Sequence, residues 1–154
     1  MGFFGTFLFD GTRWSEHDPG TEAAVAEPWL LVDIYDSDIT TVKYGPAGPG
    51  RGIAYLGYTP RTYFEDDSAS EPTSVVEEAD GLAAWWRGLH PEAEDAALEA
   101  KAREIEAYVA ADDAVPDTTE EDGSEPDDAD VFVEIKTARF LNALGLPRPV
   151  DLPG

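Results

Sequence analysis

Three short apolar runs, separated by turn-forming residues, lie between Trp29 and Tyr63, and they constrain the fold more than any other part of the chain. The runs are rich in Val, Ile, Leu and aromatic residues, and they cover Trp29–Tyr35, Ile39–Tyr44 and Ile53–Thr59. The first break is Asp36-Ser37-Asp38, and the second is the Gly- and Pro-rich segment 45–52. Asp and Ser satisfy local backbone groups, while Gly and Pro interrupt a strand ladder. The pattern predicts an antiparallel meander.

Alternation within the runs predicts which side chains face the core. In the first run Leu30, Val32 and Ile34 form a wholly apolar face, so this face should be buried. Upstream, Gly2–Phe9 also alternates, and Asp10-Gly11 is a strong hairpin signal before a short return strand over 12–14. With a possible strand extension over 61–64, we expect an N-terminal antiparallel sheet of four to five strands across about 2–64.

The rest of the chain predicts helices. Ser74 and Glu77 fit a capping box at the start of a helix over about 74–89, with an apolar stripe at 3.6-residue spacing. Pro91 suits the first position of a second helix over about 91–111. Residues 131–136 fit a helix or a strand by pattern, and we favour a helix over about 131–144, closed by Gly145. Two to three helices covering one face of the sheet make an α+β fold.

The composition is strongly acidic, with 33 Asp and Glu against 10 Lys and Arg and a formal net charge of -23. Such a chain should be repelled by nucleic acids and anionic membranes. A basic protein is the partner that this charge favours. The chain has no Cys, which excludes disulfides, thiolate metal sites and a cysteine nucleophile. The scarcity of Lys beside plentiful Ala, Gly, Pro, Asp and Glu is typical of a bacterial, GC-rich or salt-adapted source, and in the last case the acidity serves solvation.

The length of 154 residues predicts one domain over 1–154. Residues 112–130 hold ten acids and no base, so we expect a disordered acidic loop within that domain. Residues 146–154 are Pro-rich and should form an extended tail. The N-terminus lacks the basic region and the cleavage site of a signal peptide, and no run of about 20 apolar residues occurs, so the expected location is cytoplasmic.

A carboxylate cluster offers one chemical interpretation. Asp33, Asp36 and Asp38 lie at the predicted hairpin tip, and Mg²⁺ and Ca²⁺ prefer several hard oxygen ligands. These acids are therefore weak candidates for a metal site in a metal-dependent hydrolase. Their spacing is not that of an EF-hand loop, and Asp is common in turns for its local hydrogen bonds. The turn interpretation is favoured, and we assign no cofactor and no catalytic residue.

A second interpretation rests on Glu134 and Lys136. If their segment is a strand, VFVEIK over 131–136 resembles the D/E-x-K half-motif of the restriction-endonuclease-like nucleases. The resemblance implies that the acid binds a metal and that the Lys stabilises developing charge. Only 18 residues follow Lys136, whereas that fold needs a further strand and helix, and a net charge of -23 would repel the substrate. An exposed Glu and Lys on a helix is the favoured interpretation.

Three further features have ordinary structural explanations. His17 and His90 are the only histidines, and neither has a Ser or Cys partner that the sequence can identify. The segment 45–52 (GPAGPGRG) lacks the Lys and Ser or Thr of a phosphate-binding loop. Trp85 and Trp86 suggest a small-ligand pocket against the sheet, although aromatic residues at helical spacing are more often core.

The strongest candidate surface follows the predicted sheet. Arg61–Asp67 (RTYFEDD) combines aromatic and charged side chains, a mixture favoured at protein interfaces. We therefore expect partner-binding residues in this segment: Arg61, Tyr63, Glu65, Asp66 and Asp67. The function that the sequence favours is a non-catalytic, acidic interaction module that binds a basic protein, as bacterial immunity proteins and other inhibitors do. The alternatives are the hydrolase and a small-ligand-binding domain.

Overall fold

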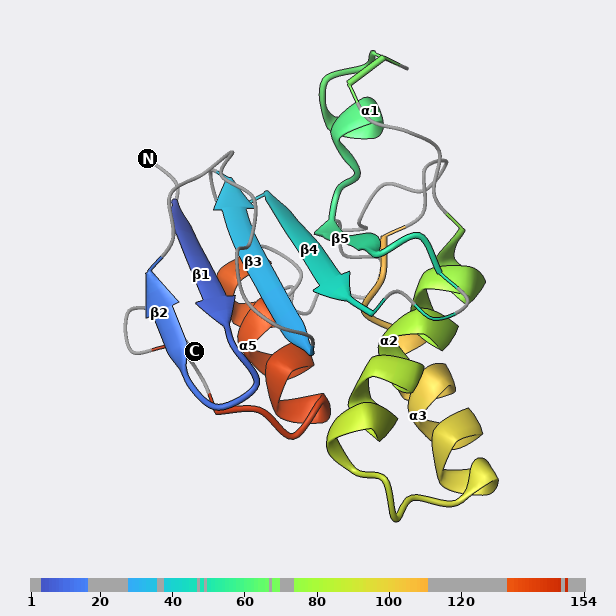
Figure 1. The fold of residues 1–154 in the computed structure, drawn as a ribbon. Coiled ribbons are helices and arrows are strands. Elements are labelled where there is room, and N and C mark those ends of the chain that lie inside the picture. The colour runs from blue at the N-terminus through green and yellow to red at the C-terminus, as the bar shows by residue number, and fades with distance from the viewer. Residues whose placement is uncertain are drawn as a thin grey trace, which may run out of the picture.

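The computed structural model describes residues 4–16, 28–35, 38–46, 48, 50–66, 68–69, 74–110, 133–147 and 149 (Figure 1). In chain order the strands are β1 (Gly5–Phe9), β2 (Trp14–Glu16), β3 (Trp29–Tyr35), β4 (Ile39–Gly45) and β5 (Ile53–Gly57). They are followed by the helices α1 (Pro60–Tyr63), α2 (Val75–Leu89), α3 (Asp95–Glu106) and α5 (Val133–Ala143). A sheet followed by helices confirms the predicted α+β class. The predicted acidic loop 112–130 lies outside the described residues.

The five strands form one antiparallel sheet in the order β2-β1-β3-β4-β5. The pairing of β3 with β4 and of β4 with β5 confirms the predicted meander. The register places Val32 opposite Phe7 on one side and Val42 on the other, and Val42 lies opposite Ala54. All four side chains are buried and form a row across the sheet that faces the helices.

The β1–β2 hairpin forms at the predicted Asp10-Gly11 turn. The Oδ1 atom of Asp10 accepts hydrogen bonds from the backbone N–H groups of Thr12 and Arg13, each at 2.9 Å. These two bonds, the one from Arg13 first, lower the pKa of Asp10 below its ordinary value because they stabilise the carboxylate. The predicted return strand over 12–14 is shifted, because residues 11–13 complete the turn and β2 begins at Trp14.

The helices cover the core face of the sheet, and Figure 1 shows α5 behind the sheet with α2 and α3 beside it. Both α2 and α5 contact β4 and β5, whereas α3 packs mainly against α2. Ser74 caps α2 as predicted, since its side chain accepts a hydrogen bond from the N–H of Glu77. The segment from Val133 is helical, which confirms the preference for a helix over a strand. In α5 the hydroxyl of Thr137 bonds to that of Thr40 in β4 at 2.7 Å, inside the core.

Two local predictions were wrong. Residues 60–63 form the short helix α1 instead of extending the sheet, because Pro60 is preorganised for a first helical position. The second long helix begins at Asp95, after a turn that includes Pro91, and it ends at Glu106. Its predicted continuation to 111 is replaced by pairing with β5, where the N–H of Ala110 donates to the carbonyl oxygen of Tyr55 at 2.7 Å.

Leu146 and Pro147, which follow α5, contact the core and β2. Leu146 is buried in the main core cluster, and the carbonyl oxygen of Pro147 accepts a hydrogen bond of 2.6 Å from the indole N–H of Trp14. The first residues of the segment predicted as an extended tail are therefore held by β2.

Candidate functional site

Five aromatic side chains from three separate segments meet beside the β3–β4 turn. Phe4 precedes β1, Tyr35 ends β3, Tyr58 follows β5, and Tyr63 and Phe64 lie at the end of α1. Tyr35 is in edge-to-face contact with Phe4, Tyr63 and Phe64, with ring centroids 5.4, 6.3 and 5.9 Å apart. Tyr63 also contacts Phe64 at 5.0 Å and Tyr58 at 5.5 Å. We call these five residues the aromatic patch.

Much of the aromatic patch is open to solvent. Among the described residues four large hydrophobic side chains are classed as exposed, and three of them belong to the patch: Phe4 at 57%, Tyr35 at 44% and Phe64 at 51%. The fourth, Val76 on α2, is 46% exposed. Isolated exposed apolar side chains are ordinary, whereas contiguous groups of them are a common feature of interaction surfaces. The concentration of exposed rings at one end of the sheet makes this the leading candidate site.

Two residues of the aromatic patch pack against buried side chains. Tyr58 and Tyr63 are partly buried and pack against a second, smaller core cluster of Ile39, Tyr55 and Ala110. This cluster lies on the face of the sheet opposite the main core, because Ile39 and Tyr55 alternate with core-facing neighbours. Tyr58 and Tyr63 are therefore held in place before any partner arrives, and this preorganisation lowers the entropy cost of binding at these two rings.

The end of α1 presents acidic residues directly after the rings. The N–H of Asp66 donates to the carbonyl oxygen of Arg61 at 3.0 Å, the six-residue closure typical of a Schellman motif. Glu65 occupies the left-handed position of this motif with φ of 52°, where Gly is usual. Asp66 accepts hydrogen bonds from the hydroxyl and the N–H of Ser68, and these lower the pKa of Asp66 below its ordinary value. Asp66 is therefore a stable exposed anion beside the patch.

Asp38, in the β3–β4 turn, forms a hydrogen bond with a residue of the aromatic patch. Its Oδ2 atom accepts a hydrogen bond of 2.8 Å from the hydroxyl of Tyr63. The structure thus brings Asp38 of the carboxylate cluster together with Tyr63 of the predicted interface segment, two separate candidates by sequence. Sequence reasoning did not link them because they lie 25 residues apart and α1 was expected to be strand.

The other carboxylate candidates have different settings. Asp33 lies within β3 and its Oδ1 atom accepts a hydrogen bond of 2.7 Å from the hydroxyl of Thr6. Asp36 and Asp67 lie outside the described residues. In the part of the chain that the structure describes, no group of three His, Asp or Glu side chains is arranged to hold a metal ion.

The half-motif residues Glu134 and Lys136 lie in the first turn and a half of α5, on a helix as favoured. The expectation that both are exposed was wrong, because Glu134 is buried, at 5% exposure, and Lys136 is half-buried. Residues two apart on a helix do not face each other, so this helix does not give them the shared face that a strand would. His90 caps the end of α2, and its ring lies beside Trp86 with centroids 5.1 Å apart. His17 lies outside the described residues.

Trp85 and Trp86 pack in and against the main core, which is the structural explanation favoured from their helical spacing. Trp85 is buried in the main core and its indole N–H donates to the carbonyl oxygen of Trp29 at 2.9 Å. Trp86 packs partly buried at the rim of the core, with the ammonium of Lys101 5.1 Å from its ring centroid. Lys101 also donates to the carbonyl oxygen of Ala143 at the end of α5. Both indoles are therefore used in packing.

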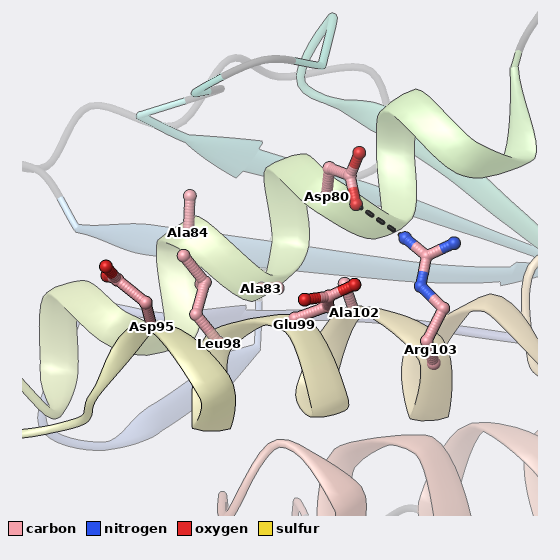
Figure 2. Close-up of a pocket in the computed structure, with 8 residues that line it drawn as sticks. All are labelled: Asp80, Ala83, Ala84, Asp95, Leu98, Glu99, Ala102 and Arg103. Carbon is pink, nitrogen blue, oxygen red and sulfur yellow. Dashed lines mark hydrogen bonds and ion pairs between the residues drawn. The ribbon is translucent and has the colours of Figure 1, made fainter.

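A groove of about 570 Å³ runs between α2 and α3 (Figure 2). Its floor includes Ala83, Leu98 and Ala102, and its rim carries charged side chains. Figure 2 shows Arg103 of α3 bonded to Asp80 of α2, at 2.7 Å. This ion pair fastens the two helices together across the groove.

The Gly- and Pro-rich segment after β4 covers a buried carboxylate that sequence reasoning overlooked. Glu78 of α2 is 0% exposed and accepts a 2.7 Å hydrogen bond from the hydroxyl of Tyr44. The backbone N–H of Arg51 donates to both of its oxygens, at 3.1 and 3.0 Å. A Cβ atom on Gly50 would overlap the Tyr44 hydroxyl and lie 2.8 Å from Glu78 Oε1, so only Gly fits there. Glu78 thus anchors this loop to α2.

Comparisons of the chain with protein-family models, with curated proteins and with solved structures find no significant match. Within the described ranges, no helix has both the length and the apolar content needed to cross a bilayer. The function must therefore be argued from the surface chemistry of the chain itself.

Proposed function

We propose that this protein is a non-catalytic interaction module that binds a basic protein through the aromatic patch and the acids beside it. The observation that carries this proposal is the exposure of Phe4, Tyr35 and Phe64 in one edge-to-face cluster. Interface hot spots are enriched in aromatic residues, because large rigid rings bury much area at little entropic cost. The rings supply the apolar centre of an interface, and the acids supply its charged rim.

The negative charge of the chain, and of the acids beside the aromatic patch, favours a basic partner. Asp38 contacts the patch directly, and Glu65 and Asp66 follow Phe64 in the chain. The whole chain carries a formal charge of -23, so its field attracts a basic protein over a long range. Complementary charge speeds association and rejects acidic competitors. An acidic module with a rigid aromatic centre suits capture of a basic partner, and inhibition of a basic enzyme is one use of such capture.

Site-specific photocrosslinking in the source cells tests the proposal. A photoreactive phenylalanine analogue replaces Phe64 in one variant and Val76 in a matched control, since both side chains are about half exposed. We expect a basic protein to be crosslinked from position 64 and not from position 76. The captured protein is then purified, and its affinity for the full chain is measured at low and high salt.

The expected affinity falls as salt rises, because the attraction between opposite charges is screened. Capture of the same proteins from both positions would overturn the proposal, because it would show that the aromatic patch does not select the partner. A partner of acidic composition would also contradict it.

A further inference from the structure

Three hydrogen bonds fix the position of Asp38 at the edge of the patch. Its N–H donates to the carbonyl oxygen of Tyr35 at 3.0 Å, and its own carbonyl oxygen accepts from the N–H of Tyr58 at 3.2 Å. The hydroxyl of Tyr63 fixes its carboxylate at 2.8 Å. Gly57 keeps the backbone of Asp38 close to β5, since a Cβ on Gly57 would overlap the carbonyl oxygen of Asp38. The carboxylate is thus held at Tyr63, whose ring contacts the exposed rings of Tyr35 and Phe64.

The packing of the rings limits which cationic side chain can bind beside the Asp38 carboxylate. Tyr35, Tyr63 and Phe64 are in mutual edge-to-face contact with centroids 5.0 to 6.3 Å apart. Rings this close touch each other and leave no enclosed cage for an ammonium group. A ligand must therefore lie against the outer surface of the cluster. A planar guanidinium stacks on one ring face and still donates hydrogen bonds in its own plane, whereas a compact ammonium does neither as well.

We propose that Asp38, Tyr35 and Phe64 form a receptor for one arginine side chain of the partner, and this inference rests on the proposed function. The guanidinium stacks on an exposed ring and forms an ion pair with the Asp38 carboxylate. Charge-assisted bonds to a carboxylate that is already positioned are among the strongest in recognition. Arginine is also weakly hydrated compared with lysine, so its desolvation on this aromatic surface costs less.

Glu65 places a further carboxylate at this end of α1. It adopts φ of 52° although a non-Gly residue is strained there, and it directly follows Phe64. The Schellman motif at the end of α1 accounts for this conformation. An exposed carboxylate at this position adds a second negative charge next to the exposed ring of Phe64.

Three short peptides test the arginine receptor on the full chain. They are acetylated and amidated Gly-Xaa-Gly-Xaa-Gly, where Xaa is arginine, lysine or citrulline, the uncharged isostere of arginine. Binding is followed by NMR through the ring protons of Tyr35 and Phe64. We expect the arginine peptide to bind about threefold or more tightly than the lysine peptide, and the citrulline peptide to bind more weakly than both.

Two variants separate the receptor from the general acidity of the chain. Asp38→Asn removes the charge but keeps an oxygen that accepts from Tyr63, and Glu99→Gln removes one exposed charge on α3. We expect Asp38→Asn to weaken arginine binding about fivefold and Glu99→Gln to change it less than twofold. Urea unfolding of Asp38→Asn shows whether its fold is retained. Phe64→Leu, which removes the ring and keeps an apolar side chain, should weaken binding by a similar factor.

Equal binding of the arginine and lysine peptides, or equal losses from Asp38→Asn and Glu99→Gln, overturns the arginine receptor. Ring protons that do not shift with the arginine peptide overturn it as well. These results leave the proposed function standing if crosslinking from position 64 still captures a basic protein. Failure of that crosslinking would overturn the proposed function separately.

Discussion

Removing the hydrogen bond between Tyr44 and Glu78 measures how much this bond stabilises a fold that contains a buried carboxylate. Tyr44 is 2% exposed and Glu78 is 0% exposed, and the Tyr44 hydroxyl donates to Oε1 at 2.7 Å. Tyr44→Phe removes only this donor and leaves Glu78 with the backbone N–H of Arg51. A buried hydrogen bond to a charged group contributes about 1.5 to 3 kcal/mol. We expect a loss of this size in the free energy of unfolding, and a fall in Tm of about 3 to 12 °C.

Tyr63→Phe is the matched control for this prediction. The Tyr63 hydroxyl also donates to a carboxylate, at 2.8 Å to Asp38, but this bond is only partly buried. Solvent replaces much of a lost bond at such a site, so we expect a loss of about 0.5 kcal/mol. Urea unfolding at neutral pH, followed by Trp fluorescence, gives both values from the transition midpoints when the slopes agree. The reasoning is refuted if Tyr44→Phe costs no more than Tyr63→Phe.

Three further predictions concern the same structure. Burial, and then the hydrogen bond to Glu78, raise the pKa of Tyr44, so the fold keeps this proton while the unfolded chain loses it above about pH 10. The free energy of unfolding should therefore fall as pH rises past about 10, by up to about 1.4 kcal/mol per pH unit for this group. Urea unfolding from neutral to alkaline pH should show a shallower fall for Tyr44→Phe than for the wild-type chain. Glu65→Gly should raise the free energy of unfolding by about 0.5 to 1 kcal/mol because Gly relieves the left-handed backbone; Glu65→Ala, measured in the same way, should give no such gain. Gly57→Ala should lower the free energy of unfolding by at least about 2 kcal/mol, since φ is 81° and the new Cβ would overlap the backbone of Asp38. Gly88→Ala in α2, where a new Cβ meets nothing within 4 Å, should instead stabilise the protein. A loss of stability in both variants would contradict this steric argument.

The sheet was predictable because its signals are local. The alternation of Leu30, Val32 and Ile34 marked the buried face of β3, and the structure buries all three at 1% exposure or less. The Asp10-Gly11 hairpin and the Ser74 cap likewise depend on neighbours in the chain. Such features follow from side-chain period and backbone preference alone.

The candidate site was only half predictable because its geometry is non-local. The composition of 61–67 predicts a candidate interface segment, but no local pattern indicates that Tyr63 bonds to Asp38 or makes edge-to-face contact with Tyr35. That juxtaposition depends on α1 folding back over the end of the sheet. Glu78 carried a better signal that was missed: it precedes Leu82 by four residues and lies on the same apolar stripe of α2, which predicts a buried carboxylate with partners.

The affinity of the crosslinked partner for two matched variants tests the central claim most directly. Calorimetry with the purified partner compares the wild-type chain with Phe64→Ala and Val76→Ala, each of which removes one half-exposed apolar side chain. If the aromatic patch is the binding surface, Kd should rise about tenfold or more for Phe64→Ala and less than about twofold for Val76→Ala. Equal affinities for the two variants would contradict the assignment of the patch as the site where this protein binds its partner.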